Sequence, residues 1–246
     1  MRDFPLPGSE YPRLEATALK IARGGKTLLD VASLTLDGPG PTLILGPNGA
    51  GKSLLLRCLH GLIEADSGQI WQDDRPLDAS QRARQAMVFQ RPVLLRRSVA
   101  ANLDFVLKRQ GMARKARAER IHELLCEGGL QDKARQSARS LSVGEGQRLA
   151  ILRALAARPE ILFLDEPTSA LDPGATQKIE TLIRRASARG TKILMVTHDI
   201  GQARRLGADI VLMWGGKVAE HRPAHGFFET PQSQAAQAFL GGALVP

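Results

Sequence analysis

The sequence predicts an α/β protein whose core is a mostly parallel sheet covered by helices on both faces. Three short apolar runs, 161–164, 192–196 and 210–214, have the composition of strands that are buried on both sides. A helical pattern over 175–189 and a shorter one beyond residue 199 separate these runs, with brief connections between them. Strand–helix–strand alternation of this kind indicates a parallel sheet, because the helices cross over between neighbouring strands.

The first part of the chain is typical of strands. Residues 14–19 alternate apolar and polar side chains, and 42–45 form a short apolar run of the kind that is buried in a sheet. Glycine pairs and glycine–proline clusters mark the turns between strands, and a leucine-rich stretch predicts the first helix. The predicted turns lie at 24–25 and 38–41, the helix at 54–59 and the strand that follows it at 86–89.

A helical, arginine-rich region follows from about residue 99 to residue 139. Between Arg91 and Arg139 the chain has twelve Lys or Arg against five Asp or Glu, a local net charge of +7, while the remaining chain has twenty-two against twenty. Such a patch indicates a solvated helix face, a nucleic-acid footprint or a surface near anionic lipid. Phe105 is its one aromatic residue, so it lacks the stacking platform of single-strand binders, and a solvated or membrane-facing surface is the preferred interpretation. Another helical pattern, 144–157, ends before Pro159.

The composition is that of an ordinary globular protein, with 43% apolar and 24% charged residues among 246. Cys58 and Cys126 lie in apolar helical stretches, which favours reduced core thiols over a disulfide or a metal site. The first twelve residues contain acids and three prolines where a signal peptide needs an apolar run, and no stretch approaches the ~20 apolar residues that span a bilayer. Any membrane role is therefore expected to come through a partner.

Residues 46–53 fit the phosphate-binding pattern G-x-x-x-x-G-K-[ST], after a predicted strand and at the start of a predicted helix. Glycines let the backbone wrap around phosphate oxygens, its N–H groups form an anion cradle, and the helix adds its positive N-terminal end. Lys52 is expected to reach the β- and γ-phosphates of a nucleotide, and the hydroxyl of Ser53 to ligate Mg²⁺. The predicted nucleotide-binding residues are Gly46, Pro47, Asn48, Gly49, Ala50, Gly51, Lys52 and Ser53.

The apolar run 161–164 ends in Asp165 and Glu166, which supply the chemistry that complements a phosphate loop. A buried strand places these carboxylates at its C-terminal end, where open α/β sheets bind ligands. Asp165 is expected to hold Mg²⁺, directly or through water. Glu166 is then positioned as the general base that polarises the attacking water. Together with the phosphate loop, this pair predicts an ATP-hydrolysing site.

Residues 141–148, Leu-Ser-Val-Gly-Glu-Gly-Gln-Arg, resemble the signature motif of ATP-binding cassette (ABC) proteins, usually Leu-Ser-Gly-Gly-Gln or Leu-Ser-Gly-Gly-Glu followed by Gln-Gln-Arg. Physically, Ser142 and the N–H groups that follow it at a helix start form a second anion site. In that family this site closes on the γ-phosphate held by the other subunit. The resemblance therefore implies a homodimer with ATP at its interface, contacted by Ser142 and Gly144. The chain departs from the pattern at Val143, where glycine is usual, and at Gly146, where glutamine is usual. Because Val143 is β-branched, it could keep the backbone from approaching phosphate, and weaker closure of the dimer is an alternative that the sequence leaves open.

Further landmarks of the family occur in the same order along the chain. Gln90 resembles the glutamine that touches Mg²⁺ and water and marks the join to the helical subdomain, and 169–172 resemble the dimer-contact loop. His198 resembles the switch histidine that senses the γ-phosphate. The family usually has an aromatic residue, stacked on adenine, just before the 24–25 turn, where this chain has Arg23. A guanidinium can stack on a base, so Arg23 either replaces that residue or is simply an exposed arginine.

The resemblance implies one ABC ATPase domain over 14–240 with the fold of a phosphate-loop (RecA-like) NTPase. Its nucleotide-binding core covers 14–90 and 159–225 and includes an N-terminal antiparallel β subdomain. An inserted α-helical subdomain, with the signature motif, covers 91–158. A C-terminal tail helix covers 226–246.

The chain is most similar to importer-type cassettes, with 86–98 and 202–206 most like those of oxyanion importers of the tungstate, phosphate and molybdate types. The resemblance implies ATP and Mg²⁺ as cofactors, transmembrane permease subunits and indirectly a solute-binding protein as partners, and a peripheral position on the cytoplasmic side of the inner membrane. The alternative is a cassette ATPase that acts on nucleic acid in translation or repair, but the second cassette or long coiled coil of those relatives is lacking. A catalytically dead regulatory cassette is disfavoured because Lys52, Asp165, Glu166 and His198 are all retained.

Overall fold

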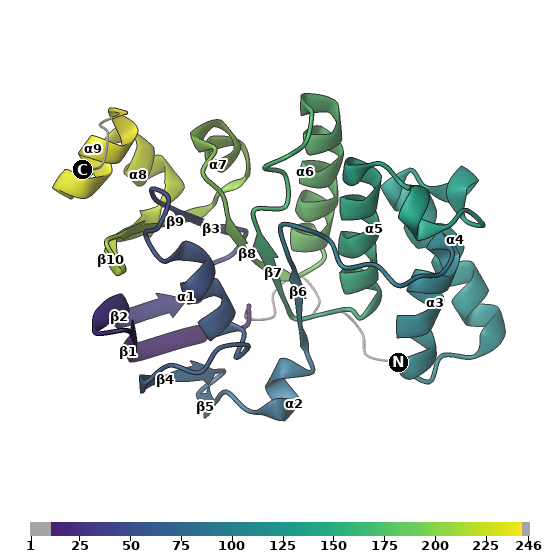
Figure 1. Cartoon of the computed structure of the whole chain (residues 1–246), viewed down its shortest axis with the longest axis horizontal. Helices are drawn as coiled ribbons and strands as arrows, with labels where there is room; N and C mark the ends of the chain where they lie inside the picture. The colour runs from purple at the N-terminus through teal and green to yellow at the C-terminus, as the bar shows by residue number, and fades with distance from the viewer. Residues whose placement is uncertain (1–10, 243–246) are drawn as a thin grey trace.

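The computed structural model describes residues 11–242, which form two sheets and the helices packed around them (Figure 1). The antiparallel sheet has the strand order β2-β1-β4-β5, and the larger sheet has the order β10-β9-β3-β8-β7-β6. None of the helices in this part of the chain is long and apolar enough to cross a membrane.

The antiparallel sheet is built from the N-terminal part of the chain. β1 and β2 form a hairpin that turns at Gly24 and Gly25, both in the left-handed region with φ of 58° and 76°. β4 pairs with the other edge of β1. The four strands are β1 (Leu14–Arg23), β2 (Lys26–Leu36), β4 (Ser67–Gln72) and β5 (Arg75–Pro76).

The larger sheet is parallel except at one edge, where β10 runs antiparallel to β9. Its central strands are apolar except at their ends, because both faces are covered. Successive residues of β7 therefore contribute to different cores: Ile161 and Phe163 pack towards α1 and the antiparallel sheet, and Leu162 and Leu164 towards the opposite helices. The strands are β3 (Thr42–Leu45), β6 (Gln85–Val88), β7 (Ile161–Asp165), β8 (Lys192–Val196), β9 (Asp209–Trp214) and β10 (Lys217–Pro223).

The helices fall into groups around these sheets. Helix α1 lies between the two sheets, while α3, α4 and α5 gather at the end of the molecule away from the antiparallel sheet (Figure 1). The α-helices up to β9 are α1 (Lys52–Leu59), α2 (Ala79–Arg82), α3 (Val99–Arg109), α4 (Arg114–Gly128), α5 (Val143–Ala156), α6 (Pro173–Ala188) and α7 (Ile200–Leu206). Between α4 and α5 the chain forms two 3₁₀ turns, η1 (Gln131–Lys133) and η2 (Ala138–Ser140).

The tail differs from the single helix predicted over 226–246. Two short helices, α8 (Ala224–Glu229) and α9 (Gln234–Leu240), replace it, and residues 243–246 lie outside the described part. Pro231 has no N–H to donate, and it disfavours helical backbone at the preceding Thr230, whose φ is −137° and ψ 65°. Ser233 then caps the second helix by accepting a hydrogen bond from the N–H of Ala236 at 3.0 Å.

Candidate nucleotide-binding and hydrolysis site

The predicted phosphate loop joins the C-terminal end of β3 to the start of α1. Its first residue, Gly46, has a φ of 143°, and a Cβ there would lie 2.2 Å from the carbonyl oxygen of Met213 on β9. The position therefore requires glycine for two separate reasons, backbone conformation and space. Because the loop ends on a helix N-terminus, its N–H groups face the place where a phosphate group would sit.

The side chain of Lys52 folds back over this loop. Its ammonium donates hydrogen bonds to the carbonyl oxygens of Gly46 at 2.8 Å and Pro47 at 2.9 Å. Burial lowers the pKa of Lys52, and the charges of Glu166 and Asp165 oppose that shift. The ammonium thus lies inside the loop, held by weak neutral acceptors that a phosphate oxygen can replace.

Asp165 ends β7 beside the start of α1, and 3% of its surface is exposed. One carboxylate oxygen accepts a hydrogen bond from the hydroxyl of Ser53 at 2.6 Å, and the other pairs with the guanidinium of Arg57 at 3.1 Å. Hydroxyl and carboxylate oxygens are the hard ligands that Mg²⁺ prefers next to nucleotide phosphates. The two oxygens that the sequence assigns to Mg²⁺ are thus adjacent, and the residues fit the ion.

Arg57 is a site residue that the sequence interpretation missed. It follows Ser53 by one helical turn, so the two side chains share one face of α1 and both reach Asp165. That spacing is a signal in the sequence, although nothing local identifies the acceptor, which lies 108 residues further along the chain.

Glu166 begins the segment after β7 in an unusual backbone conformation, with a φ of 46°. A non-glycine residue in the left-handed region carries strain of about 1–3 kcal/mol, which is typical of functional sites. Its carboxylate lies 3.3 Å from Nδ1 of His198 and 3.4 Å from the amide nitrogen of Gln90, which also donates to the hydroxyl of Ser169 at 3.0 Å. Three residues predicted separately from distant segments therefore meet at one point.

The signature segment lies at the start of α5. Ser142 is the N-cap, and it forms a capping box with Glu145 in which each side chain accepts a hydrogen bond from the other residue's N–H. Val143 follows with 62% of its surface exposed, and Gly144 packs against α6, where an added Cβ would lie 3.0 Å from that of Ala175. Within residues 11–242, the hydrogen bonds of Ser142 stay within its own helix start and do not reach the phosphate loop.

Arg23, the predicted adenine-contacting residue, lies at the end of β1. Its guanidinium pairs with the carboxylate of Asp66 at 2.8 Å, and Asp66 also accepts a hydrogen bond from the N–H of Ala22 at 2.7 Å. These contacts lower the pKa of Asp66, first through the bond from Ala22 and then through that from Arg23. The plane of the guanidinium is thus held in place at an exposed rim, while its role towards adenine stays a prediction.

A phosphate cradle, a Ser–Asp pair suited to Mg²⁺ and a Glu–His–Gln cluster at the C-terminal edge of a parallel sheet define a phosphate-loop nucleotide-binding ATPase. The sequence profile described as ABC transporter matches residues 29–169, more than half of the chain. The chain belongs to this family, and it is an ATPase.

Named relatives and solved structures agree with this family. The chain is 38% identical to the methionine import ATP-binding protein MetN of Rhizobium etli, over 94% of this chain and 69% of that protein. It is also 38% identical to the phosphate import ATP-binding protein PstB 2 of Natronomonas pharaonis, over 90% of this chain and 84% of that protein. Its fold is similar to that of cbiO1 from Clostridium perfringens, part of the ABC transporter complex cbiONQ, with a TM-score of 0.79, 28% identity and coverage of 89% and 91%. A dimeric cassette, MJ0796 bound to ADP and Pi, has a TM-score of 0.76 and 28% identity, with coverage of 86% of this chain and 98% of that one.

Proposed function

We propose that this chain is the ATP-hydrolysing subunit of an ABC importer, a peripheral protein on the cytoplasmic face of the membrane that energises a permease. The observation that carries the proposal is that His198 and Gln90 lie 3.3 and 3.4 Å from the carboxylate of Glu166. Glu166 directly follows Asp165, which is paired with Ser53. The import ATP-binding relatives support the direction of transport.

Each residue of the site has a proposed role. Lys52 binds the β- and γ-phosphates, and the backbone of 46–51 surrounds them. Ser53, Asp165 and Gln90 would hold Mg²⁺, which would supply charge neutralisation at the phosphates when bound. Glu166 takes the proton of the attacking water.

His198 completes the site. Nδ1 of His198 lies 3.3 Å from the carboxylate of Glu166, so the histidine orients that base. The other ring nitrogen of His198 is then proposed to contact the γ-phosphate. The carboxylate is thereby held in one rotamer by two neighbours, His198 and Gln90, before nucleotide arrives. Such preorganisation lowers the cost of reaching the transition state.

The chain is proposed to act as a homodimer of cassettes. Within the described residues, the hydrogen bonds of Ser142 stay within its own helix start, and the N–H groups of Val143 and Gly144 lie in the first turn of α5, at the helix end that favours anions. A partner's γ-phosphate would satisfy them, and the dimeric ADP- and Pi-bound relative supports this arrangement. Two ATP molecules would then be enclosed between two copies.

The permease is proposed to dock beside the segment that follows Gln90. Arg91, Arg96 and Arg97 are exposed there, together with Val93, of which 69% is exposed. Within the described chain, neither Arg91 nor Arg96 has a salt-bridge partner. An exposed apolar residue among uncompensated cations suits a partner helix with acidic and apolar side chains.

That segment is also bound to the signature helix. Gln147 of α5 donates a hydrogen bond to the carbonyl of Phe89 at 3.1 Å, and Arg153 donates to that of Val93 at 2.6 Å. A partner that moves the segment would therefore move Gln90 and α5 together. This supplies a mechanical route from the permease to the ATP site.

The transported solute is proposed to be an oxyanion such as tungstate, delivered by a solute-binding protein. This rests on 86–98 and 202–206, and the phosphate-import relative supports it, while the methionine-import relatives offer the competing solute class. Assembly of the chain with its permease in vesicles, followed by ATPase stimulation with tungstate, phosphate or methionine and the matching binding protein, decides between them. Stimulation by methionine alone would refute the oxyanion proposal.

The nucleic-acid alternative is favoured by one observation, the local net charge of +7 over 91–139. It predicts RNA or DNA binding that weakens steeply with salt, and ATPase activity stimulated by the nucleic acid. The importer proposal predicts that a membrane subunit co-purifies and that RNA leaves ATP hydrolysis unchanged. Strong stimulation by RNA with no membrane partner recovered would refute the importer proposal.

A further inference from the structure

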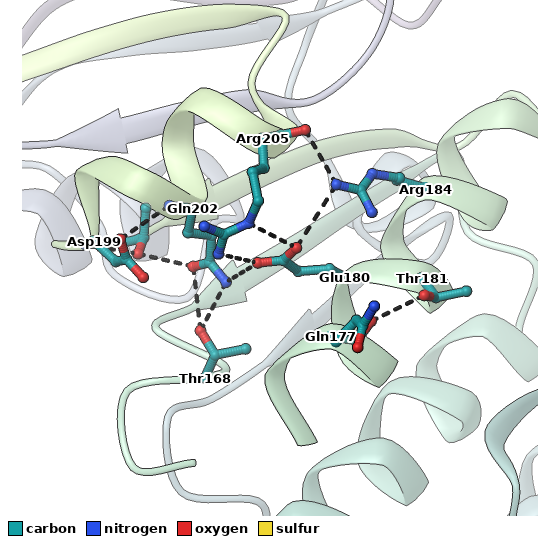
Figure 2. A network of polar contacts seen from close by, with 9 residues as sticks. Thr168, Gln177, Glu180, Thr181, Arg184, Asp199, Gln202 and Arg205 are labelled. Atoms are coloured by element: carbon teal, nitrogen blue, oxygen red, sulfur yellow. Dashed lines mark hydrogen bonds and ion pairs between the residues drawn. The ribbon is translucent and has the colours of Figure 1, made fainter. Parts of the chain in front are cut away.

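An open cleft of about 660 Å³ extends from the candidate catalytic pair into the space between α6 and α7. Glu166 and His198 line one end, and Glu180, Arg184 and Arg205 line the other. Figure 2 shows a polar network in this region, with side chains from both helices converging on Glu180 and Gln202. The network has no assigned role in the proposed hydrolysis.

Gln202 lies at the centre of that network and has no exposed surface. Its amide oxygen accepts a hydrogen bond from the hydroxyl of Thr197 at 2.9 Å, and the amide group contacts the hydroxyl of Thr168 at 3.1 to 3.2 Å. Thr197 directly precedes His198, and Thr168 follows Glu166 by two residues. One buried side chain therefore ties the segment that carries the proposed base to the segment that carries the switch histidine.

Glu180 fixes the orientation of this amide. Its carboxylate, with 3% of the residue exposed, can only accept hydrogen bonds, and it lies 3.3 Å from the amide nitrogen of Gln202. Arg205 pairs with the same carboxylate at 2.7 Å and Arg184 at 3.7 Å, so the charge of Glu180 is compensated. The nitrogen of Gln202 must face Glu180, which leaves its oxygen to face Thr197.

We propose that Gln202 is a positioning residue that sets the distance between Glu166 and His198. The last pair of the β7–β8 ladder is Asp165 opposite Val196. Beyond it, the N–H of Glu166 donates to the carbonyl of Val196 at 3.1 Å and the N–H of Thr197 to that of Ile44 at 3.2 Å, so the main chain is held by single hydrogen bonds and Gln202 adds a side-chain link between the two segments. Glu166 is also strained, with a φ of 46°, and needs surrounding contacts to keep that conformation. The inference rests on the proposed roles of Glu166 and His198, and it adds the buried link that holds them at 3.3 Å.

The test is a charge-swap cycle measured by steady-state ATP hydrolysis on the full chain. Gln202→Glu keeps the shape of the side chain but sets a carboxylate against that of Glu180, and like charges in a buried site repel. Glu180→Gln combined with Gln202→Glu restores one donor facing one acceptor. Thr168→Val removes the hydroxyl link and leaves the Gln202–Glu180 contact in place. Thr181→Val is the matched control, because that hydroxyl bonds the carbonyl of Gln177 within α6 (Figure 2).

Gln202→Glu and Thr168→Val are expected to lower kcat by about tenfold with KM for ATP unchanged, since small displacements of reacting groups cost up to about a hundredfold. The double substitution is expected to recover most of the loss, and Thr181→Val to match the wild type. Wild-type kcat in both Gln202→Glu and Thr168→Val would overturn the proposal, as would a loss in Gln202→Glu that the swap fails to repair. If Gln202→Glu does not fold, Thr168→Val decides alone, and unchanged kcat refutes the proposal. Glu166→Gln is assayed in parallel, because an active Glu166→Gln would refute the proposed base instead.

Discussion

Replacing Val143 by glycine tests how the chain's departure from the family signature affects dimer closure. Val143 is the first residue of α5, and 62% of its surface is exposed, so the change removes little buried surface. Glycine lowers helix propensity relative to valine by about 0.5 kcal/mol at most. The capping box between Ser142 and Glu145 does not use the side chain of Val143 and stays intact. The isolated subunit should therefore unfold at nearly the wild-type temperature.

The kinetic effect of Val143→Gly is expected in the dimer and not in the subunit. ATP affinity of the isolated chain should be unchanged, because within residues 11–242 the hydrogen bonds of the neighbouring Ser142 stay within its own helix start. ATP turnover at high protein concentration should be preserved or raised, since the backbone of the signature segment can approach a partner's phosphate more closely. The assay is ATP hydrolysis as a function of protein concentration, with nucleotide binding measured on dilute protein. A large loss of turnover would mean that this site is rebuilt around valine, and it would refute the reasoning.

Three other predictions concern separate parts of the chain. Lys52→Ala should weaken ATP binding by about tenfold or more, because charge-assisted hydrogen bonds are worth about 1.5–3 kcal/mol each; unchanged affinity by calorimetry would contradict this. Charge reversal of Arg96 and Arg97 should abolish transport or permease assembly while ATPase activity in solution survives, and intact transport would remove these residues from the docking surface. Cys58 is buried as predicted, but Cys126 is exposed and is not a core thiol. Burial raises the pKa of the Cys58 thiol to about 11, so at pH 8 a maleimide should modify only Cys126 in the native chain and both thiols after denaturation. Rapid modification of Cys58 in the native chain would show that α1 opens locally.

The parts of the fold that the sequence predicts best are those with an unambiguous local signal. The strands β7 and β8 follow from continuous apolar runs in the sequence. The phosphate loop follows from its glycine, lysine and serine residues, whose spacing along the chain is part of the sequence itself. β4 (Ser67–Gln72) escaped prediction, because three of its six residues are exposed and it lacks alternation; its pairing with β1 decides its structure. Pro231 marks the break in the tail, because a proline cannot continue the helix that precedes it.

The site divides in the same way. Motifs predict which residues carry chemistry, and the structure places Gln90 and His198 beside Glu166, while their roles stay predictions. The supporting contacts, such as Arg57 on Asp165, join residues more than a hundred positions apart. The choice of such partners depends on how the sheet is assembled, which no local pattern encodes. The hydrogen bond from Gln202 to Thr168 also joins separate segments, although these two residues are only 34 positions apart.

The most direct test of the account is the behaviour of Glu166→Gln in the presence of ATP and Mg²⁺. The substitution removes the proposed base but keeps the side chain's shape, so ATP should still bind while turnover falls by about a hundredfold to ten-thousandfold. Because hydrolysis would no longer open the proposed interface, gel filtration with ATP should show a stable dimer, whereas the wild type is expected to dimerise only transiently. A Glu166→Gln protein that stays monomeric with ATP, or that hydrolyses ATP at the wild-type rate, would contradict the assignment of Glu166 and the composite site built around it.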